Sequence, residues 1–176
     1  MKTSGYRTPL LVLALALASA AHAEAPRADS RVEIDWTPPA DFSEAKTYQG
    51  TGLGRQSPDE WLGDLARHLR YRAERLLPEA DHLKVTFTNV QLAGMYEPWR
   101  GPRWDDVRVI KDIYPPRIDL TFTLTDASGA VVKEGERQLR DPAFLQRGTL
   151  NATDPLRFEK RMLDDWLRSE FGEARD

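Results

Sequence analysis

The chain has 176 residues, no cysteine and a formal net charge of −3 at neutral pH. A mildly acidic chain is not expected to bind nucleic acid, because neutralising phosphates requires a basic surface. The lack of cysteine excludes disulfides, thiol catalysis, a thiolate zinc site and a thioether-linked lipid anchor.

The amino-terminal stretch has the order of a secretory signal peptide. Lys2 and Arg7 are followed by an unbroken apolar run over residues 10–18 and by the small residues of Ala21-His22-Ala23. The apolar run is about half of the roughly 20 residues needed to cross a bilayer. We therefore expect cleavage after Ala23, leaving an exported periplasmic protein, residues 24–176, with a formal charge of −5 and no transmembrane segment.

The exported part is expected to begin with a strand and a long helix. Residues 31–36 alternate between polar and apolar side chains, which predicts a half-buried strand. Ser57, Pro58 and Glu60 then form the pattern of a capping box with proline at the first helical position. Apolar residues recur at helical spacing from there, so we predict a helix over residues 58–77.

Alternating side chains also predict later strands. The alternation covers residues 83–88, with a possible extension to 92, and then residues 118–124 and 131–139. Turn residues separate the last two, which predicts an antiparallel hairpin. Residues 94–106 show no period and contain two prolines and two glycines, so we predict a long loop there, followed by a short extended piece.

The last helix is expected to start with Asp154 as its cap and Pro155 as its first helical residue. The order of elements is then strand, helix, strand, loop, two strands and helix. This order predicts an α+β fold in one domain, with two helices packed on one face of a mostly antiparallel sheet of about four strands.

The predicted loop is the strongest functional candidate, because it combines aromatic and cationic side chains. These are Tyr96, Trp99, Arg100, Arg103 and Trp104. In one interpretation, the tryptophans fold back and cover the sheet. In the other, flat aromatic rings beside guanidinium groups bind a sugar, a peptide carboxylate or a partner protein.

Two acidic patterns are candidates for metal or acid–base sites. Asp105 and Asp106 are adjacent carboxylates, but further oxygen ligands at calcium-binding spacing are missing, which favours a solvated turn. Glu60, Asp64 and His68 share one helix stripe without a second histidine, which favours a solvent-facing surface over a metal site. We expect no metal and no other cofactor.

Three longer motifs are less generic. They are Val107 to Arg117, Leu139 to Asp141 and Asp154 to Trp166. With them the chain resembles the bacterial family called domain of unknown function 3016, from Val32 to about Phe171. The resemblance implies a small exported protein of Gram-negative bacteria, and it implies no activity, cofactor or catalytic residue.

These motifs place arginines and aspartates in polar stretches. We expect Arg117, Arg140 and Arg157 to lie near Asp112, Asp141 and Asp164, with Tyr114 in a stiff turn over residues 111–117. One interpretation is an arginine–carboxylate network that locks the last helix to the sheet. The other is a pocket in which the arginines bind an anion or a peptide carboxylate.

The sequence therefore favours a non-enzymatic binding or accessory protein. Its contact surface would be the loop at 94–106 with the turn at 111–117, and its partner an envelope protein or a small anionic, peptide or sugar ligand. Two alternatives remain open. One is an enzyme acting on the cell envelope with Asp105, Asp106 or Asp112 as acid or base, and the other is a structural subunit of an oligomer.

Overall fold

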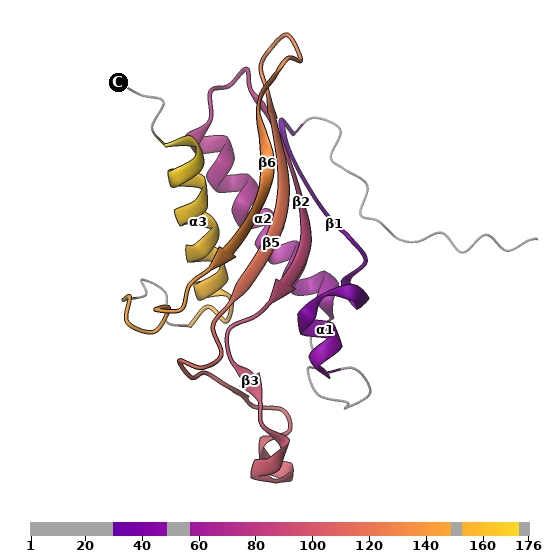
Figure 1. Cartoon of the computed structure of the whole chain (residues 1–176), viewed down its shortest axis with the longest axis vertical. Coiled ribbons are helices and arrows are strands. Elements are labelled where there is room, and N and C mark those ends of the chain that lie inside the picture. The colour runs from indigo at the N-terminus through magenta and orange to yellow at the C-terminus, as the bar shows by residue number, and fades with distance from the viewer. Residues whose placement is uncertain (1–29, 49–56, 149–152, 173–176) are drawn as a thin grey trace, which may run out of the picture.

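The computed structural model describes residues 30–48, 57–148 and 153–172 (Figure 1). The predicted signal peptide lies outside these residues. The described parts form a four-stranded sheet, two long helices and a small two-stranded hairpin.

The large sheet contains four strands in the order β1-β2-β5-β6. Their bounds are β1 Val32–Trp36, β2 His82–Gln91, β5 Arg117–Thr125 and β6 Val131–Arg140. The β1–β2 pair is parallel, whereas β2–β5 and β5–β6 are antiparallel. The predicted mostly antiparallel sheet is confirmed, because a helical crossover joins only the first two strands.

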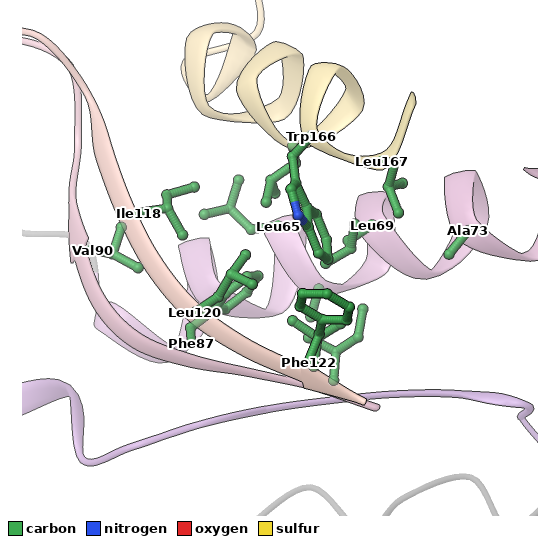
Figure 2. Close-up of a cluster of buried hydrophobic side chains, with 14 of the residues drawn as sticks. Leu65, Leu69, Ala73, Phe87, Val90, Ile118, Leu120, Phe122, Trp166 and Leu167 are labelled. Carbon is green, nitrogen blue, oxygen red and sulfur yellow. The ribbon is translucent and has the colours of Figure 1, made fainter. Parts of the chain in front are cut away.

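Both long helices cover the same face of this sheet (Figure 1). They are α2, Pro58–Leu76, and α3, Arg157–Phe171. Figure 2 shows Trp166 of α3 reaching between α2 and the sheet, where its ring lies 5.6 Å from that of Phe122. Leu65 and Leu69 of α2 are fully buried in the same core. The predicted α+β fold is therefore confirmed, with one core between the sheet and the two helices.

The opposite face of the sheet is polar. Thr86 on β2 pairs directly with Thr121 on β5, and Thr121 pairs with Glu136 on β6. Strand side chains alternate between the two faces, so the buried apolar residues of β2 and β5 point at the helices. This alternation is the pattern from which the strands were predicted.

Helix α3 is tied to the end of the sheet by arginine contacts. Arg161 donates hydrogen bonds to the carbonyls of Phe144, at 2.6 Å, and Arg147, at 2.8 Å, and it pairs with the buried carboxylate of Asp141. The segment after β6 is thereby held against α3, with its backbone acceptors satisfied by a side chain.

Three local predictions are corrected by the structure. Helix α3 begins at Arg157 rather than at Pro155, because the Asp154 carboxylate accepts the Leu156 N–H in a turn before the helix. The Ser57 side chain makes no capping hydrogen bond to α2, whose first turn is closed by the Ser57 carbonyl. A short helix, α1, Ser43–Tyr48, lies between β1 and α2, where the predicted order of elements contains no helix.

Helix α1 has six residues, which is too short to be stable alone in water. Its first N–H, at Ser43, donates to the side chain of Asn89 on β2 at 2.7 Å. Asn89 follows a register shift in the β2–β5 ladder and also donates to Asp119. A bulge in the sheet thus aims the side chain that caps this helix.

Candidate functional site

A projecting arm, residues 94–116, extends beyond one end of the large sheet (Figure 1). Its base is a two-stranded hairpin of β3, Met95–Tyr96, and β4, Arg108–Val109. Two single 3-10 turns, Pro98–Arg100 and Pro102–Trp104, follow at its tip. The predicted loop therefore has a defined structure, built from elements too short to produce a sequence period.

Two buried glutamates hold the root of the arm from opposite sides. Glu44 of α1 accepts the N–H of Leu92 at 3.0 Å, and Glu159 of α3 accepts the N–H of Ala93 at 2.6 Å. Helices α1 and α3 lie on either side of this end of β2 (Figure 1), so the two carboxylates bracket the chain where it leaves the strand. The helices on either side thereby fix where the arm starts.

Arg108 joins this root to the returning strand of the arm. Its guanidinium forms an ion pair with Glu44 and donates to the carbonyl of Gly94 at 3.2 Å. It also lies over the ring of Tyr96, 4.8 Å from the centroid. Burial is the largest single influence on Arg108 and acts to lower its pKa, but the charge and the hydrogen bond of Glu44, together with Tyr48 and Tyr96, raise this pKa above its usual value. Arg108 stays charged and binds α1 to the hairpin.

Glu159 is the most unusual acid of this cluster. Its side chain is almost completely buried, and this burial raises its pKa from 4.5 to about 7, against the N–H bond from Ala93. Its second carboxylate oxygen accepts no hydrogen bond from any described residue. A buried acid with one partner favours the protonated state.

The sequence prediction missed Glu44, Arg108 and Glu159. A signal was present for Glu159 alone, which lies three, four and seven residues before the buried Met162, Leu163 and Trp166. An acidic residue in the apolar stripe of a helix must be buried with the stripe. Glu44 and Arg108 lie in segments without periodicity, so no comparable signal existed for them.

Gly94 allows the close packing of the hairpin at the root. It has a φ of +84°, and a Cβ there would lie 2.5 Å from the Ile110 side chain and 2.8 Å from the Val109 carbonyl oxygen. We therefore expect Gly94→Ala to cost at least about 1 kcal/mol of the free energy of unfolding, because both backbone and packing oppose it. Urea denaturation measures this loss. Gly101→Ala, with φ +99° and open space around its Cβ, isolates the backbone contribution.

A third buried glutamate, Glu97, holds the arm together internally. Its side chain is fully buried and accepts hydrogen bonds from Lys111, at 2.5 Å, and from the Tyr114 hydroxyl, at 3.0 Å. Arg100 lies 2.6 Å from its other oxygen. The hydrogen bond from Lys111 holds the pKa of Glu97 below its usual range, while burial and Glu97 raise the pKa of Tyr114. Both sides of the arm therefore meet on one ionised carboxylate.

The arm exposes large apolar side chains. They are Trp99, 67% exposed, Ile113, 66%, Val107, 42%, and Trp104, 39%. Arg100 lies over the Trp104 ring, 4.8 Å from its centroid. The interpretation in which the tryptophans fold back over the sheet is therefore wrong, because the arm carries them away from it.

The structure brings only some of the predicted site residues together. Tyr96, Trp99, Arg100, Arg103, Trp104, Asp112 and Tyr114 all belong to the arm. Arg117 and Arg140 face each other at the start of β5 and the end of β6, and Arg140 pairs with Asp119 at 2.7 Å. These two arginines lie on the sheet rather than on the arm.

Arg157 and Asp164 also have other partners than the sequence predicted. Arg157 donates to the Asp154 carbonyl and lies over the Phe158 ring. The carboxylate of Asp164 contacts His68, at 2.9 Å, and Arg72, at 3.0 Å.

A network of arginines and carboxylates does connect α3 to the sheet, and Asp141 belongs to it, but its arginines are not the predicted ones. Arg161 and Arg147 meet Asp141, and Arg137 on β6 pairs with Glu170 at 2.7 Å.

The acidic candidates do not gather into a site. Asp112 and Asp106 are exposed, and Asp112 accepts the N–H of Ile113 in a local turn. Among the described residues, no three histidine or acidic side chains lie together as a possible metal site. Within the same residues, no helix is long and apolar enough to cross a bilayer.

Comparison with protein-family models gives a match over most of the chain. A family model described as "Protein of unknown function (DUF3016)" matches residues 30–169. The match covers both the large sheet with its helices and the arm. Among curated proteins, nothing matches.

Proposed function

Because the chain belongs to the DUF3016 family, whose function is unknown, we propose its function from the geometry alone. It is an exported, non-enzymatic binding or accessory protein of the periplasm, and it contacts a partner protein through the tip of its arm. The observation that carries this proposal is Trp99, 67% exposed on an arm that three buried glutamates hold in place.

The proposal is supported by the energetics of protein interfaces. Tryptophan and arginine are the residue types that most often dominate binding energy. The arm is fixed at its root, and hydrogen bonds to Glu97 hold its two sides together, so it loses little conformational entropy on binding. An exposed tryptophan on this arm lowers the solubility of the protein and does not stabilise its core. Such a side chain is expected where it contacts a partner.

Binding is favoured over catalysis by what the arm presents to solvent. The exposed groups at its tip include the rings of Trp99 and Trp104 and the guanidinium group of Arg103, whereas Asp106 and Asp112 are exposed carboxylates. General acid–base catalysis needs a carboxylate held against a bound substrate. The arm is convex, so it suits insertion into a partner.

We expect Trp99→Ala to weaken partner binding about 30-fold or more, since truncating an interface tryptophan commonly costs about 2 kcal/mol or more. Unfolding free energy should change by less than about 0.5 kcal/mol, because the side chain is mostly exposed. A photo-crosslinking amino acid at Ile113, 66% exposed on the arm, reports binding in the intact envelope, with and without Trp99→Ala.

The matched control places the same crosslinker at Val132, which is 59% exposed on β6. An adduct at position 113 that Trp99→Ala removes, and that position 132 does not give, supports the arm as the contact surface. Equal adducts from both positions, or an adduct unaffected by Trp99→Ala, would contradict the proposal. An adduct with a second copy of this chain would favour the oligomer alternative.

A further inference from the structure

We infer that the surface which receives the arm is acidic, and that an aspartate or glutamate side chain of a partner protein pairs with Arg100 and Arg103 between the two tryptophans. This inference rests on the proposed function, and it adds the chemistry of the partner. It follows from the fixed orientation of Arg100, the free charge of Arg103 and the charge balance of the arm.

Arg100 is held before any partner binds. Its Nε lies 2.6 Å from the buried Glu97 carboxylate, and the flat group lies over the Trp104 ring. Its two terminal amino groups donate no hydrogen bond within the part of the chain that the structure describes. A guanidinium offers five N–H donors in a planar fork, so the outer edge remains available for a carboxylate.

The charges around Arg100 do not cancel locally. Glu97 carries one negative charge and faces two cations, Lys111 and Arg100. Arg103 is exposed in the second turn and forms no ion pair with a described residue. Glu97, Lys111, Arg100 and Arg103 taken together therefore carry more positive than negative charge, which lowers the energy of a carboxylate placed beside the two arginines.

The arm as a whole is electrically neutral, which narrows the class of partner. Its four basic residues are balanced by four acidic ones, including Asp105, Asp106 and Asp112. A neutral arm is expected to bind weakly to a uniformly anionic membrane or to nucleic acid, because affinity for both increases with the positive charge of the protein surface. A single acidic side chain in an apolar setting fits the local excess and the exposed rings of Trp99 and Trp104.

Because the arm projects, we assign the carboxylate to the side chain of a folded partner rather than to a chain end. Capture of a carboxyl terminus uses a concave nest of backbone N–H groups. The tip is instead a protruding pair of 3-10 turns (Figure 1), and Trp99 and Arg103 are exposed on it. It is expected to enter an acidic depression of the partner.

Zero-length coupling tests this chemistry directly. In the variant Arg103→Lys, a water-soluble carbodiimide activates a touching partner carboxylate, and the new amine displaces the urea to form an amide. The expected product joins position 103 to an aspartate or glutamate of the protein that the crosslinker at Ile113 captures. Arg117→Lys, an exposed cation on β5 outside the arm, is the matched control and should give no such product.

A second readout uses Arg100→Gln, which should reduce the yield of the photo-adduct at position 113 about tenfold, with added salt reducing the wild-type yield as well. A photo-adduct without any carbodiimide product at 103, and without an effect of Arg100→Gln, overturns this inference while the arm remains a docking surface. No photo-adduct at all overturns the proposed function. Binding of the purified chain to vesicles of anionic lipid, lost in Trp99→Ala, would assign the arm to a membrane instead.

Discussion

Glu159→Gln is expected to make the protein more stable than the wild type at pH 8 and to leave it nearly unchanged at pH 5. Burial raises the pKa of Glu159 to about 7, so the folded wild type must bury a charge above that pH. A glutamine keeps an oxygen that accepts the Ala93 N–H, and it carries no charge. The variant therefore avoids the cost of ionisation.

The pH window follows from the two pKa values. The unfolded chain releases this proton near its ordinary pKa of 4.5, whereas the folded chain keeps it to about 7. Between these values the folded state binds more protons, so stability falls as pH rises, and above about 7 the loss is complete. The full loss is about 3 kcal/mol, of which roughly 2 to 3 kcal/mol occurs between pH 5 and pH 8.

Urea denaturation of both proteins from pH 4.5 to pH 8.5 measures this effect as the difference between two curves. Taking the difference removes the contribution of every other titrating group that the two proteins share. Glu134→Gln, an exposed position on β6, is the control and should run parallel to the wild type. If Glu159→Gln also runs parallel, then burial at the arm's root does not retain the proton.

The sequence predicted the large sheet and α2 because their residues interact along periodic faces. Alternation at Leu83, Val85 and Phe87 is imposed by one buried sheet face, and each of these residues is indeed buried. Helix α2 was found for the same reason, since its apolar stripe faces the core. An element that repeats its buried positions along one face of the core leaves a pattern that a single sequence is sufficient to show.

The arm and α1 left no such pattern. Strands β3 and β4 have two residues each, and α1 is held by Asn89 and Arg108, which are distant in the chain. Composition still identified the arm correctly as the place where aromatic and cationic residues gather. It did not identify Glu97 as the buried acid that organises them, because a single glutamate among exposed residues has no distinguishing spacing.

The partners of the charged side chains were harder to predict from the sequence than the strands and helices. Arg140 was expected near one of three aspartates and instead meets Asp119, which lies on β5 two residues beyond Arg117, the ladder partner of Arg140. Asp164 instead meets His68 and Arg72 on α2. Such partners are decided by register and by which helix faces pack, and neither is set by the order of charges along the chain.

Arg108→Leu is expected to produce the largest loss of stability of any substitution considered for this protein. It removes the cation paired with Glu44, whose side chain is 8% exposed, and it removes the donor to the Gly94 carbonyl. Breaking a buried ion pair by deleting one partner commonly costs about 3 to 5 kcal/mol, because the remaining charge stays buried without compensation. Chemical denaturation measures the loss, and Arg117→Leu on the exposed surface should cost less than about 0.5 kcal/mol.

The double variant Glu44→Gln with Arg108→Leu separates the charge from the packing. Glutamine at position 44 keeps an acceptor for the Leu92 N–H and carries no charge, so the double variant should be more stable than Arg108→Leu alone. Losses that simply add would show that Glu44 and Arg108 are not coupled.

Amide hydrogen exchange shows which part of the protein Arg108→Leu destabilises. If the ion pair fixes the arm, this variant should increase exchange at Gly94 and Tyr96 before it affects the strands of the large sheet. The same variant should then lose the crosslink at position 113 although Trp99 is intact. A flexible arm loses more conformational entropy on binding than a rigid one, so its contact residues bind more weakly.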